Sequence, residues 1–154
     1  MLTPLTVDNQ ALRWFALASA LLVIKCFVSN FWMGITKGKT GTVGAAEDAM
    51  FVSKPNAKAS DAFAHPTVLR AQRIVFNDQE NIPLWFMTAI LFLITGASAA
   101  EARNYFIPFV IARYLHSISY WNWLQPARDI VFFVGFFLTV GPLVTSLYRI
   151  AQIW

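Results

Sequence analysis

Four long apolar segments dominate this sequence and constrain its fold. They lie at about residues 11–35, 81–100, 105–123 and 130–154. Each is close to the roughly 20 residues that a helix needs to cross a bilayer core about 30 Å thick. Of the 154 residues, 57% are hydrophobic and 13% are charged, and so few charges could not cover this apolar surface in water. The sequence therefore predicts an all-α integral membrane protein, a bundle of four transmembrane helices.

We expect the whole chain, residues 1–154, to form a single domain. Pro66 suits a first helical position, so the second helix is expected to begin well before its apolar run. The expected helices are at about residues 11–36, 66–98, 104–123 and 127–152, with a loop at about residues 37–65. The first apolar segment is interpreted as a retained helix, because no basic region precedes it and no small-residue cleavage site follows.

The basic residues predict how the helices are oriented. Four spans place the termini and the second connection on one side, with Arg13, Arg103 and Arg149. The other side carries seven basic residues: Lys37, Lys39, Lys54, Lys58, Arg70, Arg73 and Arg128. Cytoplasmic loops are the richer in Lys and Arg, so the long loop and the third connection are predicted to face the cytoplasm. The membrane is either an endoplasmic reticulum (microsomal) membrane or a bacterial inner membrane.

Polar side chains form ordered stripes on three of the expected helices. At 100° per residue, a stripe about 80° wide on the second helix contains Arg70, Arg73, Asn77 and Glu80. The third helix repeats this pattern with Arg113, His116 and Tyr120, and the fourth opens with Arg128 and Asp129. Ionisable groups in a membrane cost several kcal/mol unless they pair or line a wet cavity.

The arginines of these stripes outnumber the carboxylates near them, Asp78 and Glu80. A surplus of fork-shaped cations suits an anionic ligand that carries carboxylates or phosphate. For each residue alone, snorkelling to lipid headgroups or packing between helices is an equally good interpretation. Three aligned stripes together favour a binding site.

Two other polar residues of the first helix are expected to be structural. Lys25 is interpreted as the partner of a neighbouring carboxylate or carbonyl. Cys26 is interpreted as a packed or lipid-facing small side chain. Because it is the one cysteine in the chain, an internal disulfide and a cysteine-based zinc site are excluded. We expect no metal site.

Taken together, these stretches resemble the MAPEG superfamily, the membrane-associated proteins in eicosanoid and glutathione metabolism. The likeness is to its microsomal glutathione S-transferase and prostaglandin E synthase branch, and it covers nearly the whole chain in order. It is carried by Leu21–Lys25, Glu47–Ala49, Arg70 and Arg73 followed by Asn77–Pro83, Ala112–Tyr120, and Gln125–Arg128 followed by Phe132–Gly135.

The resemblance implies a homotrimer that binds glutathione between subunits near the cytoplasmic face. It implies glutathione contacts from Lys37, Arg70, Arg73, Asn77, Glu80, Arg113, His116 and Tyr120. Of these, Lys37 is expected to reach the ligand from the adjacent subunit, and Arg113 to support the site. Arg128 resembles the arginine that holds the thiolate, and Asp48 resembles the loop acid linked to it.

Two departures from the family pattern affect the expected activity. Phe132 stands where the prostaglandin synthase has a tyrosine, and Asp129 replaces its small hydroxyl residue. Both favour the transferase over the isomerase. Asp129 is also expected to damp the positive field of its neighbour Arg128.

These features predict a membrane glutathione transferase that acts on apolar electrophiles, with a possible peroxidase activity toward lipid hydroperoxides. An activated thiolate attacks such compounds where the bilayer concentrates them. The alternatives are a prostaglandin-type isomerase that uses glutathione, a non-enzymatic lipid-binding scaffold, and a small anion channel. The expected partners are glutathione, an apolar small molecule or lipid, membrane lipid and further copies of the chain. Nucleic acid is not among them.

Overall fold

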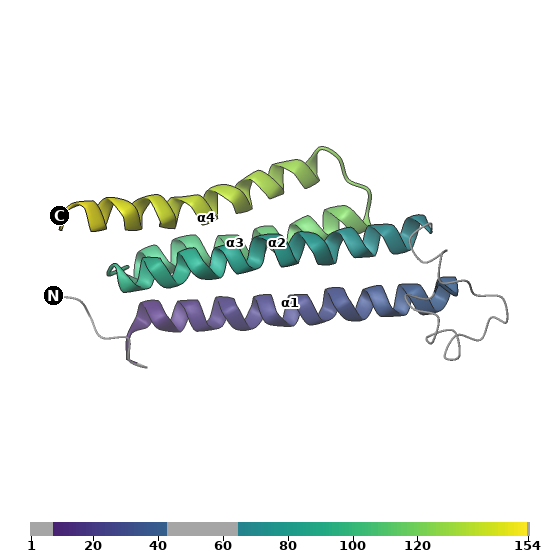
Figure 1. The fold of residues 1–154 in the computed structure, drawn as a ribbon, viewed down its shortest axis with the longest axis horizontal. Coiled ribbons are helices and arrows are strands. Elements are labelled where there is room, and N and C mark those ends of the chain that lie inside the picture. The colour runs from purple at the N-terminus through teal and green to yellow at the C-terminus, as the bar shows by residue number, and fades with distance from the viewer. Residues whose placement is uncertain (1–7, 43–64, 154) are drawn as a thin grey trace. The chain divides into compact units, whose positions relative to one another are not determined.

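The fold was obtained as a computed structural model, which describes residues 8–42 and 65–153. The described residues form four α-helices (Figure 1). They are α1 (Gln10–Thr40), α2 (Pro66–Ile94), α3 (Ala99–Trp121) and α4 (Ala127–Ala151). The all-α class predicted from the sequence is therefore confirmed.

The turn between α2 and α3 lies earlier in the chain than expected. We expected helices at residues 66–98 and 104–123, but α2 ends at Ile94 and α3 begins at Ala99. Gly96 adopts a φ of 85°, a left-handed conformation that ends a helix and favours glycine. Ser98 then caps α3, because its hydroxyl accepts from the Glu101 N–H while the Glu101 carboxylate accepts from the Ser98 N–H. This capping box satisfies two backbone donors that a helix start leaves without intrahelical partners.

The first helix is longer than expected at its carboxyl end. At its amino end, the side-chain oxygen of Asn9 accepts hydrogen bonds from the N–H groups of residues 11 and 12. These bonds cap the start of α1. The helix then runs to Thr40 rather than to residue 36. Lys37 is therefore a helical residue. Asp48 and most of the expected loop lie outside the described residues.

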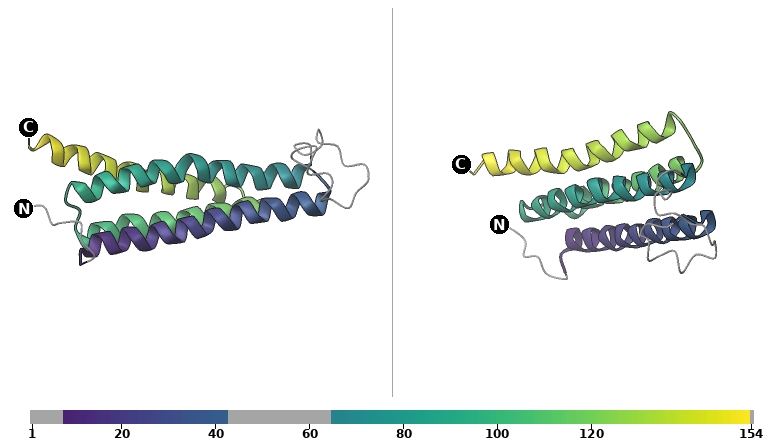
Figure 2. Two further views of the ribbon diagram at one scale, coloured as in Figure 1. Left: turned by 60° about the horizontal axis from the view of Figure 1, so that its bottom comes forward. Right: turned by 45° about the vertical axis from the view of Figure 1, so that its right-hand side comes forward.

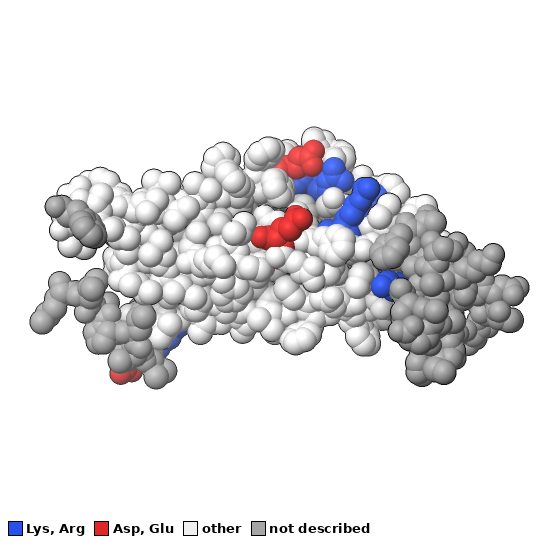
Figure 3. All heavy atoms as spheres, viewed as in Figure 1, with Lys and Arg blue, Asp and Glu red and all other residues white. Residues whose placement is uncertain are grey.

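Two of the described helices, α1 and α4, are long enough and apolar enough to cross a membrane. Many of their large apolar side chains are exposed, including Phe27, Phe31 and Phe137. Uncharged side chains cover most of the face drawn in Figure 3. By contrast, α2 carries four charged residues, and its span, like that of α3, remains a prediction.

The described chain divides into two compact units, and the smaller one contains residues 25–78. A buried ion pair joins its two helical segments. Lys25 Nζ of α1 lies 2.6 Å from Asp78 Oδ1 and 2.5 Å from Asp78 Oδ2 of α2, and the Ser29 hydroxyl donates to Oδ2 at 3.1 Å. The side chains of Lys25 and Asp78 are 3% and 2% exposed. The structural role expected for Lys25 is confirmed by this pair.

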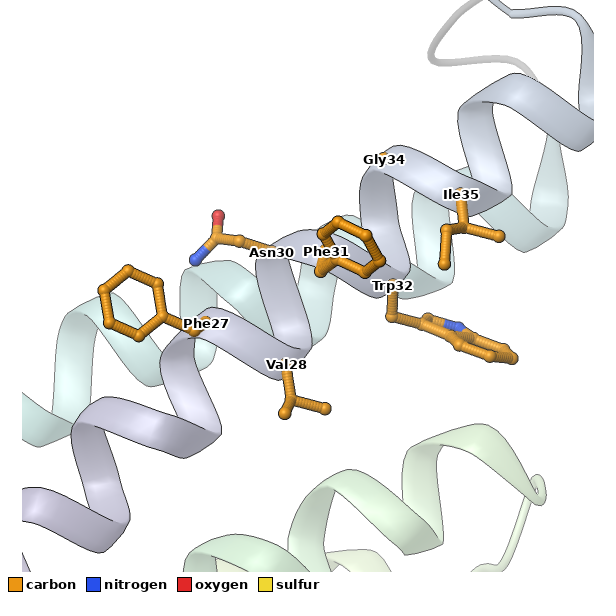
Figure 4. A pocket seen from close by; sticks show the side chains of 7 residues that line it. All are labelled: Phe27, Val28, Asn30, Phe31, Trp32, Gly34 and Ile35. Carbon is orange, nitrogen blue, oxygen red and sulfur yellow. The ribbon is translucent and has the colours of Figure 1, made fainter.

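The exposed side of α1 in the same unit forms an open apolar hollow (Figure 4). Phe27, Phe31, Trp32 and Ile35 project from the helix as its main apolar lining. Asn30 is the polar member of the lining, and its amide donates to the carbonyl of Cys26 at 2.8 Å. That bond ties one amide N–H of Asn30 to its own helix, and the other lining residues are apolar.

The larger unit contains residues 1–24 and 79–154 and is held together by aromatic packing. The Trp85 ring of α2 is fully buried. It stacks on Phe109 of α3 at 5.1 Å between ring centroids and on Phe15 of α1 at 5.9 Å. Phe106 meets the same indole edge-on at 5.4 Å. These rings form the core of the unit, since buried aromatic side chains contribute large apolar areas.

Packing of α3 along α4 completes this unit (Figure 2). At one end, Arg149 Nη2 of α4 lies 2.6 Å from Glu101 Oε1 of α3. The same guanidinium lies 5.1 Å from the centre of the Phe92 ring. Nearer the middle, a Cβ atom at Gly141 would lie 2.7 Å from Cε1 of Tyr105. The two helices therefore approach closely where α4 has no side chain.

Candidate functional site

A cluster of polar and aromatic side chains lies where the end of α3 meets the beginning of α4. His116 is buried, and its ring centre lies 5.2 Å from that of Tyr120 and 6.1 Å from that of Phe132. The Arg128 guanidinium lies 4.8 Å from the centre of the Tyr120 ring. His116 and Tyr120 from the stripe on α3 and Arg128 from the start of α4 are thus brought together in the larger unit.

Arg128 also has partners at the start of its own helix. Its Nε atom lies 3.3 Å from Asp129 Oδ1. With its amide oxygen facing the guanidinium, Gln125 accepts from Arg128 and donates to Asp129 Oδ2 at 3.2 Å. The Arg128 side chain is 29% exposed and that of Asp129 is 58% exposed. The Arg128 guanidinium is therefore held by contacts that are partly exposed to solvent or lipid.

Arg113 lies one turn before His116 on α3 and is almost fully buried. It faces Gly135 of α4, where an added Cβ atom would lie 3.7 Å from Arg113 Nη1 and 3.9 Å from Phe109 Cε2. The absence of a side chain at Gly135 thus leaves room for the guanidinium between the two helices. Arg113 thus lies between α3 and α4, the two helices that also carry the cluster.

The predicted stripe on α2 begins in the smaller unit. Arg70 and Asn77 are half-buried there, and Arg73 is exposed. Glu80, the last member of the stripe, belongs to the larger unit and is exposed. Because the helix is continuous from Pro66 to Ile94, the spacing that puts these side chains on one face of α2 is retained.

Asp78 is not part of the polar stripe on α2. The sequence suggested that it balances the stripe arginines, but its carboxylate is buried against Lys25. Positions 77 and 78 are 100° apart on a helix, so Asp78 points away from the stripe direction. This leaves Glu80 as the acid of the α2 stripe and increases the excess of cations predicted there.

The two remaining predicted residues lie at or near the long loop. Lys37 is half-buried in the last turns of α1, in the smaller unit. Asp48 lies outside the described residues, so its predicted link to Arg128 stays a prediction. Gln125 and Ser29 were not predicted as contacts. The sequence signal for Gln125 was its position three residues before Arg128, and Ser29 lies one turn after Lys25 on α1.

The cluster has the chemistry of an anion site. No group of three or more His, Cys, Asp or Glu that could hold a metal ion occurs within residues 8–42 and 65–153. Arg128 presents a permanent cation at the first turn of α4, where backbone N–H groups also favour negative charge. Tyr120 and His116 add hydrogen-bonding groups beside it.

The fold and this cluster together describe an all-helical protein of the membrane type with a cationic site at a helix start. A sequence profile of the MAPEG family matches residues 15–148. The match covers most of the chain, and the chain belongs to the MAPEG family. This confirms the resemblance drawn from the sequence and makes the protein a member of a membrane-associated family.

Curated relatives come from two groups within this family. The chain is 29% identical to prostaglandin E synthase of Homo sapiens over 129 residues, which are 83% of this chain and 82% of the relative. The Macaca fascicularis prostaglandin E synthase gives the same identity and coverage. Microsomal glutathione S-transferase 1 of Mus musculus is 27% identical over 136 residues, 88% of each chain. The chain is thus about equally similar to both groups.

Proposed function

We propose that this protein is an integral membrane glutathione transferase that acts on apolar electrophiles. The single observation that carries this proposal is the cluster of Arg128, Tyr120 and His116 at the α3–α4 junction. Membership of the MAPEG family, with a glutathione S-transferase among the relatives, supports it. A lipid hydroperoxide is proposed as a second kind of substrate.

The residue set suits glutathione, which carries two carboxylates, one ammonium group and a thiol. Arg128 is assigned to the thiol, because a guanidinium beside the sulfur favours the anion. An ordinary cysteine thiol has a pKa of about 8.5 and is mostly protonated at neutral pH. When bound, glutathione supplies the nucleophilic sulfur. The protein contributes by holding a cation next to that sulfur and by orienting the tripeptide.

The other predicted residues are assigned to the rest of the tripeptide. Arg70, Arg73 and Lys37 suit its carboxylates, and Glu80 suits its ammonium group. Asn77, His116 and Tyr120 supply neutral hydrogen bonds, and Arg113 supports the cluster from one turn deeper. Asp48 is assigned a link to Arg128. Because Lys37 is assigned to a neighbouring subunit, this site requires the homotrimer that we propose.

The apolar surface of the protein suits a substrate that dissolves in the membrane. The exposed aromatic side chains of α1 and α4 are suited to contact with acyl chains and with neighbouring subunits. We propose that all four helices cross the membrane and that the site faces the cytoplasm. A compound concentrated by the bilayer then reaches the thiolate from the lipid side.

Replacing Arg128 tests the assignment. We expect Arg128→Ala to lower the rate of conjugation of an apolar electrophile about tenfold or more, because loss of an adjacent cation raises a thiol pKa by one unit or more. The measurement is a conjugation assay on detergent-purified full-length protein, with Arg103→Ala as the matched control. Arg103 is an exposed arginine near the start of α3. Equal rates in wild type and Arg128→Ala would reject the role of Arg128.

Glutathione binding tests the class itself. Calorimetric titration of the purified protein with glutathione should give saturable binding, and an ultraviolet difference spectrum should show the thiolate. If glutathione does not bind, the transferase proposal and the isomerase alternative both fail. Saturable binding of a fatty acid in that case would favour a lipid-binding scaffold, which the contact of Arg128 with Asp129 makes a specific alternative.

A prostaglandin-type isomerase is the second enzymatic candidate. The similarity to prostaglandin E synthases at 29% identity favours it. Phe132, which lies against His116, lacks the hydroxyl that the resemblance predicts at this position in the synthase. A parallel assay with a prostaglandin endoperoxide distinguishes the two activities.

A further inference from the structure

Asp129 occupies the position where an anionic ligand would compete for Arg128. Its Oδ1 atom lies 3.3 Å from Arg128 Nε. With the Gln125 amide oxygen turned toward the guanidinium, the Asp129 Oδ2 atom also accepts from the Gln125 amide at 3.2 Å. Gln125 in turn accepts from the same guanidinium. These three side chains close a small ring of contacts at the first turn of α4, and the carboxylate is its one negative member.

The contact between Arg128 and Asp129 has the geometry of a weak ion pair. It is a single contact at 3.3 Å, whereas strong pairs of arginine with carboxylate are shorter and often bidentate. Asp129 is also 58% exposed, so solvent screens its charge and the side chain can move aside. A carboxylate in this position weakens the field of the cation without neutralising it, and a stronger anion can displace it.

Among residues 8–42 and 65–153, the contacts of Arg128 come from the end of α3 and the start of α4. From α3 the Tyr120 ring lies against the guanidinium, with His116 behind that ring. From the start of α4 come Asp129 and Gln125. Among the described residues, Asp129 is therefore the acid that contacts Arg128 directly. We expect the removal of its charge to act mainly on Arg128.

We propose that Asp129 restrains the thiolate-forming power of Arg128 by competing for its guanidinium. This inference rests on the proposed glutathione site and adds to it a residue that sets how much thiolate forms. A weakened cation gives less thiolate at neutral pH, and this lowers the rate of conjugation. Asp129 is a positioning and tuning residue here, since it acts on the sulfur through Arg128.

A simpler role for Asp129 makes a different prediction. A carboxylate in the first turn stabilises a helix through its dipole, and the Pro126 cap of α4 makes no side-chain hydrogen bond. If this were its whole role, neutral variants would lower the unfolding temperature and leave the bound thiol unchanged. Thermal unfolding and thiolate formation therefore have to be measured on the same samples.

The experiment uses detergent-purified full-length protein and glutathione itself. We expect Asp129→Asn to lower the apparent pKa of the bound thiol by about 0.5 to 1 unit, which is roughly three- to tenfold more thiolate below both pKa values. The ultraviolet absorbance of the thiolate is followed across a pH series. Asp129→Glu, which keeps the charge, should resemble the wild type. Asp129→Ser is a second neutral variant, in case the Asn variant does not fold.

The outcomes separate this inference from the function on which it rests. If glutathione binds and forms a thiolate with the same apparent pKa in wild type and in a folded neutral variant, the role of Asp129 is rejected and the transferase proposal stands. If Asp129→Glu changes the thiol as much as Asp129→Asn, charge competition is also rejected. If glutathione binds to none of the proteins, the proposed function fails and this inference fails with it.

Discussion

The ion pairs Lys25–Asp78 and Arg128–Asp129 combine the same kinds of charge in opposite surroundings. The first pair is almost wholly buried, with contacts of 2.5 and 2.6 Å and an added hydrogen bond from Ser29. The second is exposed to 29% and 58%, with one contact at 3.3 Å. Lys25 contacts both carboxylate oxygens of Asp78, whereas Arg128 has a single, longer contact with Asp129.

This difference separates charges that hold the fold from charges that serve a ligand. A buried pair is costly to break, because the remaining charge stays in a low dielectric. A half-exposed pair contributes little to stability, because solvent screens it and the side chains lose entropy when they pair. We therefore expect stability to depend on the first pair and chemistry on the second.

The largest loss of stability is expected when the Lys25 charge is removed. We expect Lys25→Met to lower the free energy of unfolding by about 3–5 kcal/mol, because it leaves the Asp78 carboxylate buried without its cation. The measurement is denaturant unfolding of the detergent-solubilised protein. The double variant Lys25→Met/Asp78→Leu should recover most of the loss, since an apolar pair of similar volume can replace a buried ion pair. A double variant as unstable as the single one would contradict this explanation.

The pair of Glu101 with Arg149 is intermediate in exposure between the Lys25–Asp78 and Arg128–Asp129 pairs. Its contribution to stability is expected to depend on pH. Burial raises the pKa of Glu101, but hydrogen bonds from the Ser98 backbone and hydroxyl, together with Arg149, bring it below its ordinary value of 4.5. A lowered pKa stabilises the fold above the unfolded-state value, and this stabilisation is lost as pH falls through the folded-state value.

We expect Glu101→Gln to lower the free energy of unfolding by about 0.5–1 kcal/mol at pH 7, since the carboxylate is 38% exposed and screened. Gln can keep the capping box, so the loss reports the charge. The stabilities of wild type and variant, measured at several pH values, should converge as the pH falls through the lowered folded-state pKa of Glu101. A difference that persists unchanged in acid would assign the effect to packing.

The smallest effect is expected at the first turns of α1. Arg13 and Asp8 lie 3.7 Å apart, with side chains 61% and 98% exposed. We expect Arg13→Ala to leave the unfolding midpoint unchanged within error, at low salt and at high salt. A clear loss of stability would show that burial does not determine how much each ion pair contributes to stability.

The sequence was a good guide to the helices and a poorer guide to where they end. Pro66 indicated where α2 begins, and α4 begins at Ala127, three residues before its apolar run. The turn after α2 was placed too late, because its residues are apolar and small and extend the hydrophobic run. The Ser98-x-x-Glu101 pattern was the local signal that outweighs this run, since a capping box satisfies backbone donors.

Helical spacing predicted that His116 and Tyr120 share a face of α3, and the structure adds that their rings are in contact. Arg128 was predicted from its position at the start of α4 and from the family resemblance, and its guanidinium lies over the Tyr120 ring. Spacing did not identify Asp78 as the partner of Lys25, because 53 residues separate the two positions in the chain. Nor did it indicate Gln125, whose contacts depend on how the chain turns into α4. One sequence contains no information on such long-range pairings beyond charge and periodicity.

The position of Cys26 has a practical consequence for spectroscopy. It follows Lys25 directly on α1, it is half-buried, and it is the one cysteine in the sequence. A thiol-reactive dye or spin label therefore attaches at a single place in the native chain without engineered cysteines. That place is next to the buried ion pair, so a label there reports on the surroundings of the pair that we expect to matter most for stability.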